Sequence, residues 1–243
     1  GSAAPRSMIE AFETLGVTVV HAWGMTEMSP VGTHGLLSQH HHRELTQDQR
    51  FDLQARQGRR AFGVDLKIVD EAGQALPHDG IAAGDLYVRG NGIISGYFED
   101  PAATASAFDS AGWFGTGDVA SIDPEGFLII QDRAKDLIKS GGEWISSIDL
   151  ENIVMGHPEV ANCAVIAVPH PKWDERPLLV VVPRGSYKVT KAEIDSLLLA
   201  HVARWQLPDA IEFVEKLPLT ATGKVSKLTL RQQFEAFELP NET

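Results

Sequence analysis

Apolar residues recur at helical spacing through residues 6–15, and Gly16 follows the last of them. This pattern predicts a short helix that ends at the glycine. Residues 17–23 are rich in β-branched side chains and end in an aromatic one, which predicts a buried strand. That strand would lead into Gly24-Met25-Thr26-Glu27, the kind of strand end where α/β sheets place ligands. Residues 34–58 are polar, and we expect them to be partly helical.

Short runs with the composition of strands fill the middle of the chain, at residues 64–69, 84–89, 119–123 and 127–132. Glycine-rich turns separate these runs. Many short strands joined by such turns predict a small β-barrel or a curved sheet over about residues 60–132.

The pattern changes at residues 132–136, which are densely charged and suggest a linker. Beyond it, the apolar pattern predicts helices at residues 146–155, 190–204 and 227–237, and strands at residues 160–168, 178–183 and 210–215. Thr190-Lys191-Ala192-Glu193 is a capping box at the start of the second of these helices. Strands covered by helices predict a small α+β domain over residues 133–243.

Composition narrows the classes of function. The chain has 243 residues, 43% of them hydrophobic, and a formal net charge of −12. Such an acidic balance argues against a nucleic-acid partner and against docking on anionic membrane. No apolar stretch is long enough for an integral membrane segment, and residues 1–6 lack the pattern of a signal peptide, so a cytoplasmic protein is expected. The single cysteine, Cys163, lies in an apolar run and is expected to be a buried structural thiol.

The first candidate motif is Trp23-Gly24-Met25-Thr26-Glu27. Its residue types suit a nucleotide, because the aromatic ring offers a stacking face, Thr26 can bond a phosphate oxygen and Glu27 can hold Mg²⁺. Taken alone, the motif fits a plain strand-to-loop turn equally well.

Three further segments carry candidate chemistry. Residues 112–118 combine glycines, which allow close approach of the backbone to a ligand, with Asp118, an acceptor for ribose hydroxyls. Residues 132–144 place charged side chains before a Gly-Gly turn and an aromatic, and Thr220-Ala221-Thr222-Gly223-Lys224-Val225 presents one lysine on a polar loop. Considered singly, the three also fit a capped glycine turn, a solvated charge run and an ordinary surface loop.

The run His40-His41-His42 could bind a metal. Adjacent histidines do not face one another on a helix, and the spacing does not match a structural zinc site. We therefore do not predict a metal there. The chain also lacks a nucleophile elbow, a Walker loop and a dinucleotide-binding fingerprint.

In their order and spacing, however, the four segments resemble the C-terminal half of the adenylate-forming enzymes, which include acyl-CoA synthetases, luciferases and peptide-synthetase adenylation domains. Residues 23–27 resemble that family's aromatic-Gly-x-Thr-Glu motif, and residues 113–118 its Thr-Gly-Asp motif. Arg133 to Lys135 match its hinge, and Gly223-Lys224-Val225 its catalytic lysine motif. Residues 139–146 and 169–177 are most similar to medium- and long-chain fatty acyl-CoA synthetases, and synthetases for short methylthio-substituted acids look alike here.

The resemblance implies a mixed α/β and α+β multidomain fold. Residues 1–132 would be the end of the large AMP-binding domain, with the small β-barrel subdomain at about residues 60–132. Residues 133–243 would be the small α+β lid domain, with its hinge near Lys135. The implied activity has two steps: a carboxylate and Mg-ATP give acyl-AMP and pyrophosphate, and coenzyme A then displaces AMP to give the thioester.

The roles of individual residues follow from the resemblance by match of motif. Lys224 would be the catalytic lysine, Glu27 would hold Mg²⁺, and Lys135 would also serve as the hinge. The residues that would bind ATP or AMP are Gly1, His21, Ala22, Trp23, Thr26, Asp118, Arg133, Lys135, Lys139 and Trp144. Gly141, Gly142 and Glu143 would meet coenzyme A.

The chain also departs from the family pattern. Trp23 stands where tyrosine is commoner, and Lys227 where arginine is usual. The family's phosphate loop is not found in these residues, and most of the acyl pocket is expected upstream of residue 1. Residues 1–5 resemble a segment internal to these enzymes, so we interpret them as native sequence. An aryl-, amino- or short methylthio-acid relative and a folded, non-catalytic fragment remain as alternatives, and a homodimer is open.

Overall fold

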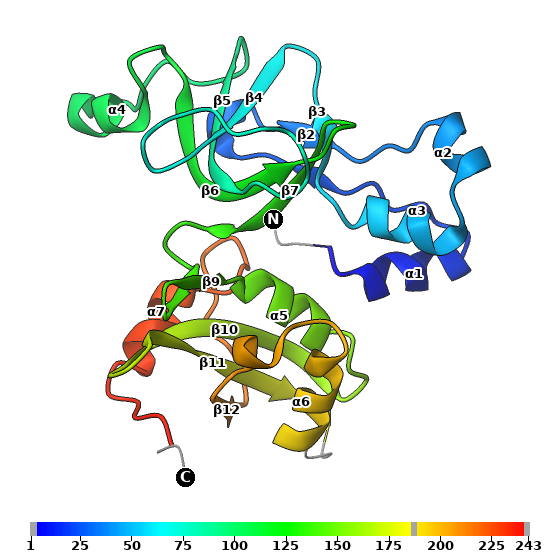
Figure 1. Cartoon of the computed structure of the whole chain (residues 1–243), viewed down its shortest axis with the longest axis vertical. Helices are drawn as coiled ribbons and strands as arrows, with labels where there is room; N and C mark the ends of the chain where they lie inside the picture. Colours follow the sequence, from blue (N-terminus) through cyan, green and yellow to red (C-terminus); the bar gives the residue numbers. More distant parts are fainter. Residues whose placement is uncertain (1–3, 186–188, 241–243) are drawn as a thin grey trace. The chain divides into compact units, whose positions relative to one another are not determined.

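The computed structural model describes residues 4–185 and 189–240. The chain divides into two compact units, Met8–Ala134 and a second that combines Lys135–Thr243 with the residues before Met8; we call them the N-terminal and C-terminal units (Figure 1). The division falls between Ala134 and Lys135, close to the charged segment that the sequence analysis interprets as a linker.

A seven-stranded antiparallel sheet forms the N-terminal unit, in the order β1-β2-β3-β7-β6-β5-β4. Its strands are β1 Ala22–Trp23, β2 Thr33–His34, β3 Gly58–Arg60, β4 Val64–Val69, β5 Gly84–Gly90, β6 Phe114–Ile122 and β7 Phe127–Arg133. Register shifts interrupt the β5–β6 and β6–β7 ladders, and such bulges bend a sheet. Among the described residues, the strand pairings form a curved open order, from β1 at one edge to β4 at the other.

Short helices join and flank these strands. They are α1 Arg6–Thr14, the 3₁₀ helix η1 Thr26–Met28, α2 Gln39–Glu44, α3 Gln47–Gln54 and α4 Pro101–Ala107. Capping boxes begin α2 at Ser38 and α3 at Thr46, which explains why this polar segment is helical. None of the helices in the described parts of the chain is long and apolar enough to cross a membrane.

The buried strand expected over residues 17–23 is wrong. Only Ala22 and Trp23 belong to a strand, and they pair with β2. The side chains of Val17 and Val20 stay 48% and 44% exposed. β-Branched residues fit a pleated, half-buried surface, but in the described residues the segment before Ala22 belongs to no strand, and Val17, Thr18 and Val20 stay exposed.

The C-terminal unit is built on a five-stranded sheet of order β10-β11-β8-β9, with β12 parallel to β11. Its elements are β8 Ile138–Ser140, β9 Glu143–Ile145, α5 Ser147–Val154, β10 Val160–His170, β11 Asp174–Pro183, α6 Lys191–Leu199, the 3₁₀ helix η2 Arg204–Gln206, β12 Ala210–Phe213 and α7 Lys227–Gln233. Thr190 caps α6 through the expected box with Glu193. The β8–β9 hairpin was not expected from the sequence.

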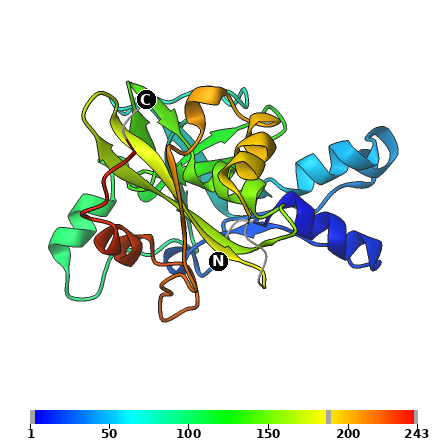
Figure 2. The same ribbon diagram turned by 90° about the horizontal axis from the view of Figure 1, so that it is seen from below.

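Both faces of the β10–β11 pair are buried, because side chains alternate between two cores. One core joins Cys163, Val165, Leu179 and Val181 to residues of α5 and α6. The other joins Ala164, Ile166, Leu178 and Val180 to Leu217 and to Leu230 of α7. Figure 2 shows α6 and α7 on opposite sides of these two strands.

Cys163 is a buried free thiol, as expected, and its Sγ donates to the carbonyl of Glu151 at 3.5 Å. Burial raises the pKa of this thiol far above its ordinary value. Nearby, Lys227 at the start of α7 pairs with Glu151 of α5 at 2.7 Å. The same ammonium donates to Ser147 Oγ at 2.5 Å, so Lys227 ties α7 to α5.

Two leucines of the C-terminal unit give a matched test of this core. Leu179 is fully buried, whereas Leu199 is 49% exposed. We expect Leu179→Ala to lower the free energy of unfolding by about 2–5 kcal/mol, because it removes apolar contacts and leaves a cavity. Leu199→Ala should change it by about 0.5 kcal/mol or less. Urea unfolding measures both, and equal losses would contradict the two-faced core.

Candidate functional site

Three side chains that are distant in sequence meet in the N-terminal unit. Trp23, at the end of β1, donates its indole N–H to Asp118 Oδ2 of β6 at 3.0 Å. Arg133, at the end of β7, lies with its Nε 3.5 Å from Asp118 Oδ1. The carboxylate therefore has one oxygen bonded to the aromatic residue and the other beside a guanidinium that is 52% exposed.

The backbone around Asp118 is strand rather than the free glycine turn that the sequence also allowed. Thr116 donates its hydroxyl to the carbonyl of Leu86 on β5 at 2.9 Å and accepts from the amide of Asp118 at 3.1 Å. Gly117 has a φ of +73°, a conformation in which glycine is favoured, and its carbonyl accepts from Ala134. These bonds fix the direction in which Asp118 projects.

Asp118 is 6% exposed, and burial raises the pKa of its carboxyl above the ordinary value. Arg133 and the bond from Trp23 act in the opposite direction, because both favour the ionised form, whereas neighbouring Asp132 adds to the rise. A buried carboxylate with one flank open to an exposed arginine can accept hydrogen bonds from hydroxyl groups of a ligand.

Thr26 and Glu27 lie on η1, directly after Trp23. Gly24 is needed for this path, because a Cβ there would lie 2.0 Å from the carbonyl oxygen of Pro30. Glu27 Oε1 accepts from the hydroxyl of Tyr97 at 3.2 Å, and burial together with this carboxylate raises the pKa of Tyr97. Tyr97 was not a sequence candidate, and no local pattern links it to a residue so far away in the chain.

Glu27 has the chemistry expected of a magnesium ligand. Mg²⁺ prefers oxygen donors and is commonly held by one or two carboxylates together with phosphates of its substrate. One carboxylate on η1 fits that mode. In the parts of the chain that the structure describes, no group of three or more His, Cys, Asp or Glu side chains could hold a metal on its own.

His21 and Ala22 precede Trp23 and differ in exposure. His21 is buried, its Nδ1 lies 3.0 Å from the carbonyl oxygen of Ala55, and burial lowers its pKa. Ala22 is exposed on β1. Gly1, the remaining candidate of this group, lies outside the described residues.

The candidates of residues 139–144 share the β8–β9 hairpin of the C-terminal unit. Lys139 on β8 and Trp144 on β9 are register partners, and the ammonium lies 4.8 Å from the indole ring centroid. Gly141 and Gly142 form the turn with φ values of +62° and +92°. Glu143 follows the turn and is exposed. The hairpin thus presents one cation, one aromatic ring and a glycine turn whose first amide, that of Gly141, donates to the carbonyl of Trp173 at 2.8 Å.

Lys224 is exposed at the tip of a tight loop in the same unit. The backbone of Thr220 brackets that loop, donating to the carbonyl of Lys224 at 2.7 Å and accepting from Gly223 at 2.9 Å. Thr220 Oγ1 also accepts from the amide of Lys224 at 3.2 Å. The loop leads directly into α7, whose first residue Lys227 is anchored to α5. Lys224 is therefore an exposed side chain on a loop whose backbone is held by hydrogen bonds.

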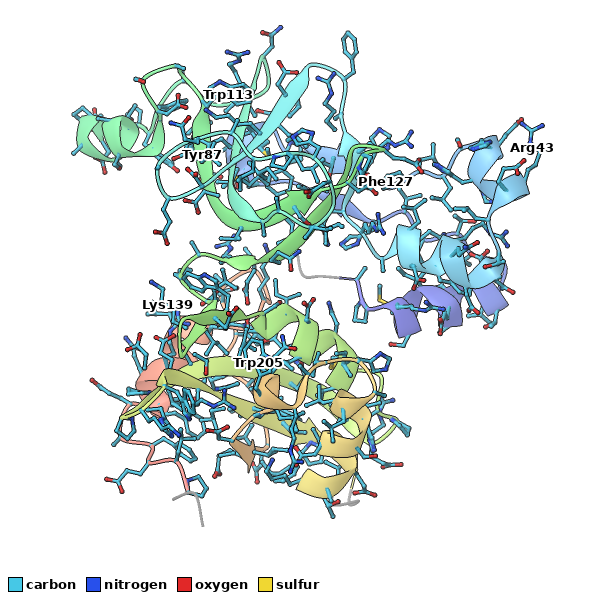
Figure 3. The ribbon with its side chains drawn as sticks, in the orientation of Figure 1. Arg43, Tyr87, Trp113, Phe127, Lys139 and Trp205 are labelled. Carbon is cyan, nitrogen blue, oxygen red and sulfur yellow. The ribbon has the colours of Figure 1, made fainter. Side chains whose placement is uncertain are left out.

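The structure thus brings Trp23, Asp118 and Arg133 together in the N-terminal unit, where Glu27 pairs with Tyr97. The hairpin and Lys224 belong to the C-terminal unit. Lys135 is exposed and begins the Lys135–Thr243 part of that unit. The histidine run lies elsewhere: His41 caps α2 and pairs with Glu125 at 3.1 Å. Its ring also packs edge-on against Phe127, a residue that Figure 3 labels, so its observed contacts are structural.

Both groups of residues lie in a chain that matches two family models of one class of enzyme. A family model described as the AMP-binding enzyme matches residues 1–98, and one described as the AMP-binding enzyme C-terminal domain matches residues 149–224. The chain belongs to this adenylate-forming enzyme family.

Relatives and solved structures agree with this assignment. A 3-methylmercaptopropionyl-CoA ligase of Ruegeria lacuscaerulensis is 52% identical over 97% of this chain and 43% of its own length. A medium-chain-fatty-acid–CoA ligase of Ectopseudomonas oleovorans is 50% identical over 96% of this chain and 42% of its own. ATP-bound MatB from Rhodopseudomonas palustris matches with a TM-score of 0.82 and 27% identity, over 97% of this chain and 44% of that one. The chain therefore spans less than half the length of these relatives.

The bond from Trp23 to Asp118 can be tested directly. Because the indole N–H favours the ionised carboxylate, Trp23→Phe should raise the pKa of Asp118 further. Carboxyl ¹³C NMR titration of Asp118 measures the change. Trp113→Phe, in the same unit, is the control and should leave the value unchanged. A pKa that falls in Trp23→Phe would mean that the bulk of the ring matters, and not its N–H.

Proposed function

We propose that this chain forms the C-terminal part of an AMP-forming acyl-CoA synthetase that activates a fatty acid of medium or long chain. ATP and the acid would give acyl-AMP and pyrophosphate, and coenzyme A would then take the acyl group as a thioester. The observation that carries the proposal is the meeting of Trp23, Asp118 and Arg133 from three different strands.

In this proposal Asp118 and Arg133 hold the ribose of ATP. The carboxylate would accept the ribose hydroxyls, and the exposed guanidinium beside it would contact them as well. Trp23 would offer a ring face to adenine while its indole N–H donates to Asp118. Gly1, His21 and Ala22 would line the adenine or acyl side.

Thr26 would contact phosphate, and Glu27 would hold Mg²⁺, which when bound neutralises phosphate charge. The hydroxyl of Tyr97 holds Glu27 Oε1 and so orients the carboxylate.

Lys224 would act on the first step. Negative charge builds up at the α-phosphate as the carboxylate attacks, and a cation aimed there lowers the barrier. The tight loop holds the backbone of Lys224 while the side chain remains free to reach. Residues 1–132 would belong to the large AMP-binding domain and residues 133–243 would be the lid. Rotation about Lys135 would withdraw Lys224 and bring in the hairpin, where Lys139, Gly141, Gly142, Glu143 and Trp144 would meet the nucleotide and coenzyme A.

The substrate class rests on the relatives and on residues 139–146 and 169–177. The two ligases named above act, by their names, on a methylthio acid and on medium-chain fatty acids, and their identities to this chain differ little. A short methylthio acid is therefore the second candidate. We further propose a cytoplasmic location, and a homodimer remains a proposal that the mass in solution would test.

A substrate panel tests the proposed class. The full-length protein that carries this chain should release pyrophosphate with fatty acids, and faster with these than with 3-methylmercaptopropionate, aryl acids or amino acids. Pyrophosphate release measured at equal acid concentrations decides this order. Activity confined to a methylthio acid would move the assignment to the second candidate, and activity confined to aryl or amino acids would reject both.

A second test concerns Lys224. Lys224→Ala in the full-length protein should lower the rate of adenylation by about a thousandfold, because it removes the cation from the α-phosphate. It should largely spare thioester formation from supplied acyl-AMP. Lys216→Ala removes another exposed lysine of the same unit and should change neither step. Equal loss of both steps in Lys224→Ala would refute the proposal that Lys224 acts on adenylation and not on thioester formation.

A further inference from the structure

Arg176, on β11, is a buried cation of the C-terminal unit with several hydrogen-bond partners. It is 9% exposed. Its Nε and Nη2 donate to the carboxylate of Asp209 at 2.6–2.9 Å. Its remaining donors reach the carbonyls of Trp205 and Leu207 at 2.8 and 3.0 Å, and Ser140 Oγ at 2.8 Å. An arginine has five N–H donors in a rigid fork, and here each has an acceptor.

These bonds connect two different parts of the unit. Asp209 and the two carbonyls belong to residues 205–209, the segment that leads from η2 into β12. Ser140 is the last residue of β8, directly before the Gly141-Gly142 turn. Figure 3 labels Trp205 on the first part and Lys139 on the second. Arg176 therefore fixes the base of the hairpin to the body of the sheet.

Residues next to Arg176 hold the hairpin in the same way. Asp174 is the register partner of Ser140. The carbonyl of Trp173 accepts from the amide of Gly141 at 2.8 Å. The carboxylate of Glu175 accepts from the amide of Lys139 at 2.9 Å. Residues 173–176 thus hydrogen-bond or pair with residues 139, 140 and 141.

The indole of Trp173 fixes the turn itself. It covers Gly141 so closely that a Cβ there would lie 2.8 Å from the ring. The turn that carries Trp173 is in turn held by His170, whose Nδ1 accepts from the amides of Lys172 and Trp173 at 3.1 Å. A two-stranded hairpin with strands as short as β8 and β9 has little stability of its own. Its shape therefore depends on the segment 170–176.

We propose that Arg176 is a positioning residue for the Gly141-Gly142 turn, and that through Ser140 it governs the coenzyme A step and not the adenylation step. This inference rests on the proposed function, in which the turn meets coenzyme A. Arg176 touches no substrate in this role. It holds the backbone amides of the turn where the thiol-bearing chain of coenzyme A passes.

Two variants of the full-length protein test the proposal. Ser140→Ala removes one acceptor and leaves the pairing of Arg176 with Asp209 intact. Arg176→Lys keeps the charge but cannot reproduce the fork. For both we expect kcat/KM for coenzyme A, with supplied acyl-AMP, to fall about tenfold, because one bond to a charged group is lost. The KM for ATP in pyrophosphate release should stay within about twofold of the unchanged protein.

Thr190→Ala is the matched control, because it removes the cap of α6 in the same unit and touches no residue of the hairpin. It should lower the melting temperature without moving the KM for coenzyme A. Equal losses in both half-reactions for Ser140→Ala, or the same pattern in Thr190→Ala, would overturn the positioning role. If the unchanged full-length protein performed neither half-reaction, the proposed function itself would fall, which is a distinguishable result.

Discussion

A charged side chain that leaves water must find partners, and this constraint shapes both units of the chain. In the N-terminal unit, the buried carboxylate of Asp118 joins β1, β6 and β7 through Trp23 and Arg133. In the C-terminal unit, Arg176 joins β8, β11 and the segment before β12. In each case burial makes an unpaired charge energetically costly, and the partners that the charge therefore needs fix the position of the side chain. A site that must hold ligands in defined places gains from that rigidity.

The hydrophobic pattern predicted secondary structure correctly where the signals lie within the segment itself. Strands were expected at residues 160–168 and 178–183, where the structure has β10 and β11, and the capping box at Thr190 marked the start of α6. The segment before Ala22 has the same β-branched composition and yet forms no strand, since pairing depends on what lies beside it. The β8–β9 hairpin was not predicted, because its polar residues carry no strand pattern. Hydrogen bonds from its backbone to residues 173 and 175, distant in sequence, hold it in place.

Motif order suggested which residues carry the chemistry, and the structure adds how some of them are held. That Asp118 and Arg133 might serve one ligand was implied by resemblance, and their proximity is now an observed distance. That Trp23 donates to Asp118, or that Tyr97 donates to Glu27, could not be read from the chain, because each bond joins residues far apart in sequence. Arg176 stood in a segment noted only for its similarity to one subclass. Its five donors become meaningful when their acceptors are known.

Cys163 gives this chain an experimental advantage. It is the only cysteine in the 243 residues, it is buried, and its thiolate is strongly disfavoured. Maleimide reagents attack thiolates that solvent can reach, so the native protein offers them no competing target within this chain. A cysteine introduced at an exposed position of either unit would be labelled alone. Fluorophores placed in this way could report on movement of one unit against the other without any need to remove a native thiol.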